Sequence, residues 1–267
     1  MDQSSRQIFD ISPPVQHGSP VFPGDTPYSQ EWVASLGPGC PVNVSAVTLS
    51  PHVGAHADAP LHYDPEGQAI GQVPLEPFIG HCRVIHAIGC GPLIRVEHLS
   101  HAMTTDSPQG RSRGESAPSG GSDPHSGGAR GPTDLPQGRS RGESAPSGGS
   151  DPRSGGAWGP LPPRILVRVY ERMPQDRFDE ALPAFAPETV TWLADQGVIL
   201  IGIDTASIDP ANSKTLDSHQ VIRQRGMRVL ENLVLDDVPE GDFELIALPL
   251  KLMQADASPV RAILRPF

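Results

Sequence analysis

Two nearly identical copies of a low-complexity segment interrupt the chain, and they constrain its fold more than any other feature. Residues 108–132 read PQGRSRGESAPSGGSDPHSGGARGP, and residues 136–160 repeat them with two substitutions. Repeats that stack into solenoids carry apolar residues, whereas these copies carry almost none. Gly, Ser, Pro and Arg bury too little apolar surface to offset the chain entropy lost on folding. We therefore predict that residues 104–160 form a disordered tandem-repeat insert; a tail that binds a partner or directs localisation is the alternative.

The sequence outside the repeats carries the net charge and has the length of one domain. The chain has 267 residues and a formal net charge of -11, yet residues 104–159 contain six Arg and six acidic residues and are neutral. The whole charge therefore belongs to residues 1–103 and 161–267, about 210 residues, which we predict to form a single domain. An acidic protein repels phosphate backbones, so nucleic acid is excluded as a partner.

Neither a membrane segment nor a disulfide framework is predicted. No stretch approaches the ~20 apolar residues that cross a bilayer, and residues 1–14, MDQSSRQIFDISPP, lack the apolar centre of a signal peptide. The three cysteines are odd in number and form no CxxC motif. We expect a cytoplasmic protein with no membrane partner.

The flanking sequence alternates between strand-like and helix-like segments. Apolar runs rich in β-branched residues predict strands at 45–50, 81–89, 164–170, 198–205, 243–252 and 261–267. Helices are predicted at 95–103 and at 187–197, where Pro stands near the start and Gly at the end. Residues 218–233 have a helical pattern that Gly226 divides. Strands outnumber helices, which favours an α/β domain with a mixed sheet.

One short stretch gathers four side chains that can bind metal or transfer protons. His52, His56, Asp58 and His62 fall within eleven residues. In a straight strand, His52 and His62 would lie about 33 Å apart. A helix would not turn all four to one face, and Pro60 is excluded from a helix interior. We therefore predict a bent segment that wraps its ligands around one point.

Two imidazoles and a carboxylate form a partial coordination shell for Zn²⁺ or Mn²⁺. Further ligands must then come from elsewhere in the chain. A surface loop that is rich in histidine by chance is the alternative interpretation.

The stretch resembles the metal motif H-x-G-[TA]-H-x-D-x-P-x-H of the cyclase-like metal-dependent hydrolase family, and its bacterial kynurenine formamidases in particular. Three further segments are similar to that family: PVFPGDTPY (20–28), GIDTASIDP (202–210) and the run from SHQ to ENL (218–233). The resemblance covers residues 6–103 and 162–267, nearly everything outside the repeats.

The resemblance implies a swivelling β/β/α fold, a homodimer or larger homo-oligomer, and two divalent metal ions per chain, zinc or alternatively manganese. The ligands that it assigns are His52, His56, Asp58, His219 and Glu231. His52 and His56 would bind the first ion and His219 the second, whereas Asp58 and Glu231 would reach both. His62 would be the catalytic proton-transfer residue.

The implied activity is that of an arylformamidase of the kynurenine pathway, which hydrolyses N-formyl-L-kynurenine to L-kynurenine and formate in tryptophan degradation. Relatives typically carry Trp, stacked on the substrate's aryl ring, where this chain has Phe22. Phenylalanine keeps an aromatic face but loses area and the indole N–H; packing in the core is the alternative role. Two alternative functions are hydrolysis of isatin or another cyclic or aryl amide, and non-catalytic metal binding.

Overall fold

The computed structural model describes residues 7–103 and 159–267. The predictions made for the repeats therefore lie outside the described residues. None of the helices in these two ranges is long and apolar enough to cross a membrane.

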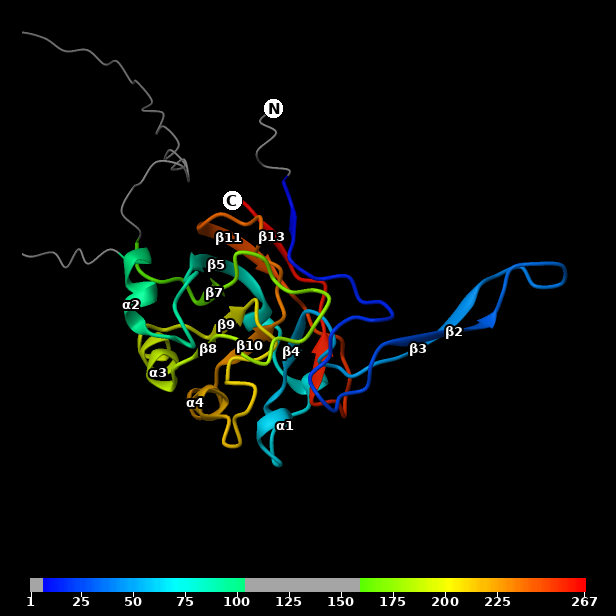
Figure 1. Ribbon diagram of the computed structural model, residues 1–267, viewed down its shortest axis with the longest axis horizontal. Helices are drawn as coiled ribbons and strands as arrows, with labels where there is room; N and C mark the ends of the chain where they lie inside the picture. Colours follow the sequence, from blue (N-terminus) through cyan, green and yellow to red (C-terminus); the bar gives the residue numbers. More distant parts are fainter. Residues whose placement is uncertain (1–6, 104–158) are drawn as a thin grey trace, which may run out of the picture. The chain divides into compact units, whose positions relative to one another are not determined.

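A mixed nine-stranded sheet organises the described residues (Figure 1). Its strand order is β1-β13-β11-β5-β7-β9-β10-β4-β12. The central strands β5, β7, β9 and β10 pair in parallel, and the strands on both sides of them are antiparallel. The strands are β1 (Phe9–Asp10), β4 (His56–Asp58), β5 (Ile79–His86), β7 (Arg164–Arg168), β9 (Leu200–Ile203), β10 (Arg228–Glu231), β11 (Gly241–Ile246), β12 (Ala257–Pro259) and β13 (Ile263–Arg265). The predicted α/β class with a mixed sheet is confirmed.

Short helices cover one face of this sheet. They are α1 (Pro60–Tyr63), α2 (Val96–Leu99), α3 (Pro187–Asp195) and α4 (Asp217–Arg225), with a 3₁₀ turn at Ser100–Ala102. The 3₁₀ turns at Ile70–Gln72 and Glu76–Phe78 pack on the other face. Val190 of α3 and Ile222 of α4 pack in one core with Ile201 of β9. Leu200, the next residue back along β9, belongs to a second core on the opposite face. Both faces of the parallel strands are thus buried, which explains why they read as continuous apolar runs.

Gly226 converts one apparent helix into a helix and a strand. Helix α4 ends at Arg225, Gly226 has a left-handed φ of 65°, and β10 begins at Arg228. Glycine at this position caps a helix without a Cβ penalty. By contrast, the strand predicted at 243–252 was too long, because β11 ends at Ile246 and Pro249 offers no N–H for a ladder.

Arg83 holds together the two chain ends that border residues 104–158. Its buried guanidinium donates hydrogen bonds to the carbonyl oxygens of Ala102 (2.8 Å) and Gly159 (3.0 Å). It also forms an ion pair with Asp242 at 2.6 Å. The chain therefore leaves and re-enters this domain at neighbouring points.

The remaining strands form two small sheets. Strands β6 (Leu93–Ile94) and β8 (Ala184–Phe185) pair in parallel. Strands β2 (Ser29–Ala34) and β3 (Val44–Thr48) form an antiparallel hairpin that projects from the body (Figure 1). This hairpin exposes Trp32 (60%), Val33 (67%) and Leu36 (66%).

Candidate metal centre

The segment from His52 to His62 is bent, as the sequence predicts. A turn at residues 51–55 precedes β4, and α1 begins at Pro60, which occupies the first helical turn. Gly54 makes the bend possible: its φ is +70°, and a Cβ there would lie 2.6 Å from Val15. Strand β4 then runs between β10 and β12, which places His56 opposite Glu231.

Four of the predicted ligands meet in the interior: His56, Asp58, His219 and Glu231 are all buried. Glu231 Oε2 lies 3.3 Å from His56 Nε2. His219 Nε2 lies 3.3 Å from Asp58 Oδ2 and 3.5 Å from Glu231 Oε1. Two carboxylates and two imidazoles therefore surround a common point, although Asp58 and His219 are 161 residues apart in the sequence.

The fifth predicted ligand, His52, lies at the edge of this cluster. Its Nδ1 is 3.1 Å from Asp58 Oδ1, and its side chain is 14% exposed. His62 lies further out, with its side chain 30% exposed and its ring centre 4.4 Å from that of His52. The structure thus brings together all six of the residues that the metal motif and the resemblance identified.

Each of the three buried or nearly buried histidines is anchored through the ring nitrogen that faces away from the cluster. His56 Nδ1 bonds the carbonyl oxygen of Gly54 (2.9 Å). His219 Nδ1 bonds Asp209 (2.7 Å), and His52 Nε2 bonds Asp256 (2.9 Å). Such outer partners fix the orientation and tautomer of metal-binding histidines. The other nitrogen of every ring is left directed at Asp58 or Glu231.

Asp209 and Asp256 are functional candidates that the sequence analysis missed. Asp209 lies within the segment 202–210 that carried part of the resemblance, and its carboxylate also accepts the backbone N–H groups of Ser218 and His219. Asp256 has no sequence signal. It reaches the centre only because β12 pairs with β4.

The electrostatics of the cluster favour a positive charge between its carboxylates. Burial alone would raise the pKa of Asp58, but the neighbouring imidazoles of His219, His52 and His56 hold that pKa well below its usual range. Burial likewise disfavours a charged His219, yet Asp209, Asp58 and Glu231 raise the pKa of its ring well above the usual value. Hydrogen bonds from His52 and His62 hold the pKa of Asp256 low.

Two buried atoms show that protein groups alone do not satisfy the cluster. His56 Nε2 and Asp58 Oδ1 are buried without a hydrogen-bond partner. In the neutral ring of His56, Nδ1–H donates to the carbonyl oxygen of Gly54, and Nε2 then presents a lone pair to the carboxylates of Asp58 and Glu231. Acceptors that face acceptors in the interior are unfavourable unless a cation lies among them. The donor set of imidazole nitrogens and carboxylate oxygens suits a divalent transition metal.

The ligand atoms fall into overlapping groups that could each hold one ion. Their coordinating atoms lie within 4.8 Å of one another in the groups His52–His56–Asp58 and Asp58–His219–Glu231. Asp58 belongs to both groups. A third group of the described residues joins His52 and His62 to Asp256.

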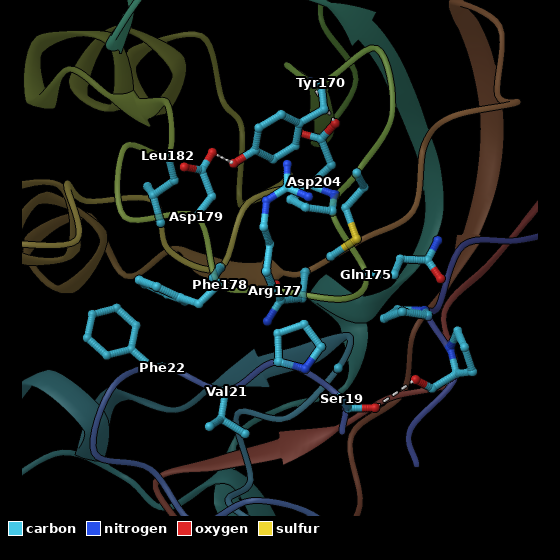
Figure 2. A pocket seen from close by; sticks show the side chains of 18 residues that line it. Ser19, Val21, Phe22, Tyr170, Gln175, Arg177, Phe178, Asp179, Leu182 and Asp204 are labelled. Atoms are coloured by element: carbon cyan, nitrogen blue, oxygen red, sulfur yellow. Dashed lines mark hydrogen bonds between the residues drawn. The ribbon is translucent and has the colours of Figure 1, made fainter. Parts of the chain in front are cut away.

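A pocket that opens to solvent is lined in part by chain neighbours of the predicted ligands. Figure 2 shows the side chains of its lining. Phe22 and Phe178 meet edge to face on its wall, with ring centres 5.0 Å apart. Phe22 is 36% exposed, so it is not a core residue. Gly54 and Asn232 also line the pocket, and each is a close chain neighbour of predicted ligands. The ligand side chains themselves do not line it.

Comparisons with known proteins identify the family. The family model described as "Putative cyclase" matches residues 9–111. The chain is 58% identical over 260 residues to the kynurenine formamidase of Paracidovorax citrulli, covering 97% of each chain. It is 56% identical to that of Delftia acidovorans, covering 98% of each.

Solved structures share the fold at low sequence identity. A potential metal-dependent hydrolase with cyclase activity superposes with a TM-score of 0.64 at 21% identity, over 97% of this chain and 96% of the other. An isatin hydrolase bound to the product analogue thioisatinate superposes with a TM-score of 0.65 at 17% identity, over 98% of this chain and 93% of the other. Fold, family model and full-length relatives agree, and the chain belongs to the cyclase family, in its group of kynurenine formamidases.

Proposed function

We propose that this protein is an arylformamidase that hydrolyses N-formyl-L-kynurenine to L-kynurenine and formate, a step of tryptophan degradation in the cytoplasm. The observation that carries the proposal is identity of 48–58% over nearly the whole chain to relatives named kynurenine formamidase. The cluster of three histidines and two carboxylates supplies the chemistry that amide hydrolysis requires.

The proposed cofactor is a pair of divalent metal ions, zinc or alternatively manganese. His52, His56 and His219 would hold the ions through nitrogen, and Asp58 and Glu231 would reach both. When bound, such ions supply Lewis acidity, which lowers the pKa of water and polarises an amide carbonyl. The hydrogen bonds to Gly54, Asp209 and Asp256 support this role because they direct the second nitrogen of each ring inward.

His62 is the proposed proton-transfer residue. Cleavage of the formamide releases an aniline nitrogen that needs a proton, and an imidazole exchanges protons near neutral pH. Its place supports this role: the ring is 5.9 Å from that of His219, yet it remains in contact with solvent. A residue that must gain and lose a proton in each turnover benefits from that access.

Phe22 is proposed to contact the aryl ring of the substrate. It lines the pocket that chain neighbours of the predicted ligands also line, and its ring makes an edge-to-face contact with Phe178 (Figure 2). The loop that carries Phe22 is tied to the metal segment, because Ser50 Oγ donates to Asp25 (2.9 Å) and accepts the backbone N–H of His52.

A homodimer or larger homo-oligomer is also proposed, with the β2–β3 hairpin in the interface. Trp32, Val44 and Val47 are exposed on this two-stranded sheet by 60%, 46% and 48%. An isolated hairpin is at best marginally stable in water. Contiguous exposed apolar residues mark interaction surfaces. A second copy of the chain would cover them.

Isatin is the second candidate substrate, since three of the similar folds are isatin hydrolases. Those structures are 17–18% identical to this chain, which establishes the fold alone. Steady-state kinetics of zinc-loaded protein with both compounds tests the proposal. We expect a far higher kcat/KM for N-formylkynurenine. A preference for isatin would support the second candidate, and turnover of neither would favour non-catalytic metal binding.

A further inference from the structure

Asp256 connects the predicted metal centre to the predicted proton-transfer residue through a single oxygen atom. Its Oδ2 lies 2.9 Å from His52 Nε2 and 3.2 Å from His62 Nδ1. The centres of the two imidazole rings are 4.4 Å apart and their planes are inclined by 47°. One carboxylate therefore sets the position of both rings.

The backbone fixes Asp256 independently of its side chain. The carbonyl oxygen of Asp256 accepts the N–H of Ala59 at 2.8 Å. The next residue, Ala257, pairs with Asp58 in the β12–β4 ladder. The side chain is 42% exposed, so it contributes little to the core. The fold thus holds this carboxylate in place, and its removal should leave the fold intact.

Because a carboxylate only accepts hydrogen bonds, its two partners must both donate to it. The hydrogen is therefore on Nε2 of His52 and on Nδ1 of His62. In the neutral ring that binds a metal, His52 would then present a lone pair on Nδ1, the atom that lies 3.1 Å from Asp58 Oδ1. His62 is left with Nε2 for proton exchange. His52 would thus bind metal through Nδ1, whereas His56 and His219 present Nε2.

We propose that Asp256 is a positioning residue for the reaction: it fixes the tautomer and orientation of His62 and, through the same oxygen, holds His52 as a metal ligand. This inference rests on the proposed function, since it assigns Asp256 to the same hydrolysis. Carboxylates that orient a catalytic imidazole act in this way in other hydrolases.

The test is a double-mutant cycle on the full-length protein, with Asp256→Asn, His62→Ala and the combination assayed at saturating zinc. We expect Asp256→Asn to lower kcat with N-formylkynurenine at least about tenfold, less than removal of the whole imidazole, with little change in KM. In the His62→Ala background, the same substitution should change kcat less than about twofold, because additivity fails for residues that act through one another. Asp256→Glu should restore part of kcat.

Metal affinity provides a second readout that does not depend on turnover. Loss of an outer hydrogen-bond partner of a metal-binding histidine typically weakens metal binding by about 10- to 100-fold, so Asp256→Asn should bind zinc more weakly by that amount. Asp64→Asn is the matched control, because the carboxylate of Asp64 pairs with Arg223 (2.7 Å) and not with either imidazole.

Two outcomes would overturn the inference. One is wild-type kcat and zinc affinity in Asp256→Asn. The other is an equal loss of kcat with and without His62. A wild-type protein that does not hydrolyse N-formylkynurenine would instead refute the proposed function, whatever Asp256 does.

Discussion

The candidate metal centre has a buried half and an open half, and the two differ in their exposure to solvent. The buried half consists of His56, Asp58, His219 and Glu231, whose side chains are 1–4% exposed. The open half consists of His52, His62 and Asp256, which are 14%, 30% and 42% exposed. Buried charges need a fixed cation between them, whereas a proton carrier needs access to solvent. We therefore propose that the buried half retains the metal, and that the open half moves protons and completes the metal shell through His52.

The largest expected effect comes from removing Asp58 in the buried half. Because Asp58 belongs to both groups of candidate ligands, Asp58→Asn should empty the centre of metal. Turnover should fall by more than the ~10⁴-fold upper range of general acid–base catalysis. Elemental analysis and kinetics check this. The nearby Asp64→Asn, at a partly exposed residue that pairs with Arg223, is the control. A metal-loaded, active Asp58→Asn enzyme would contradict the proposed role of the buried half.

The next largest effect is expected from His62 in the open half. His62→Ala should leave the metal content intact and reduce kcat by about 10²–10⁴-fold, the usual contribution of general acid–base catalysis. The control is His81→Ala, another histidine that faces a carboxylate, at 3.3 Å from Asp242. Loss of metal from His62→Ala would show instead that His62 is a metal ligand and not a proton-transfer residue of the open half.

How well the sequence predicts the site also differs between the two halves. The ligands of the buried half lie in a dense motif or in segments that resemble the family, so the sequence predicts them without the fold. Asp256 could not be found, because a lone Asp before a short strand carries no pattern. Its role arises from a strand pairing that joins residues 204 positions apart, as its bond to His52 shows.

The same limit applies to the fold. Apolar runs predicted the central strands because a strand that is buried on both faces has apolar residues at successive positions, as in β9, where all four residues are buried. The end of β11 was misplaced because residues 247–252 remain apolar after the pairing stops. Strand order itself depends on contacts between distant segments, which no local pattern encodes.

A smaller effect should follow from loosening His219 without removing it. Asp209→Asn weakens the partner of His219 Nδ1, which should reduce metal affinity by about 10- to 100-fold but leave kcat within a few-fold at saturating zinc. Competition with a chelator measures the affinity. Asp217→Asn, at the exposed start of α4, is the control. Equal metal affinities in the two variants would show that Asp209 does not support metal binding by His219.

The smallest effect is expected from replacement of the repeats. Replacement of residues 106–157 by a short Gly/Ser linker keeps Ala102 and Gly159, which Arg83 holds together. Loop closure costs only about 0.6 kcal/mol per doubling of length, so metal content and turnover should stay within a few-fold. A folded, metal-loaded variant that loses its activity or its oligomeric state would show that the repeats take part in function.

The central claim is that hydrolysis depends on metal bound by this cluster, and one titration tests it most directly. Protein stripped of metal by a chelator is titrated with zinc while bound metal and N-formylkynurenine hydrolysis are measured together. The account predicts no activity without metal and a rise that reaches its plateau at about two ions per chain, the number that two imidazole–carboxylate groups sharing Asp58 can hold. Full activity in the metal-free protein would contradict it.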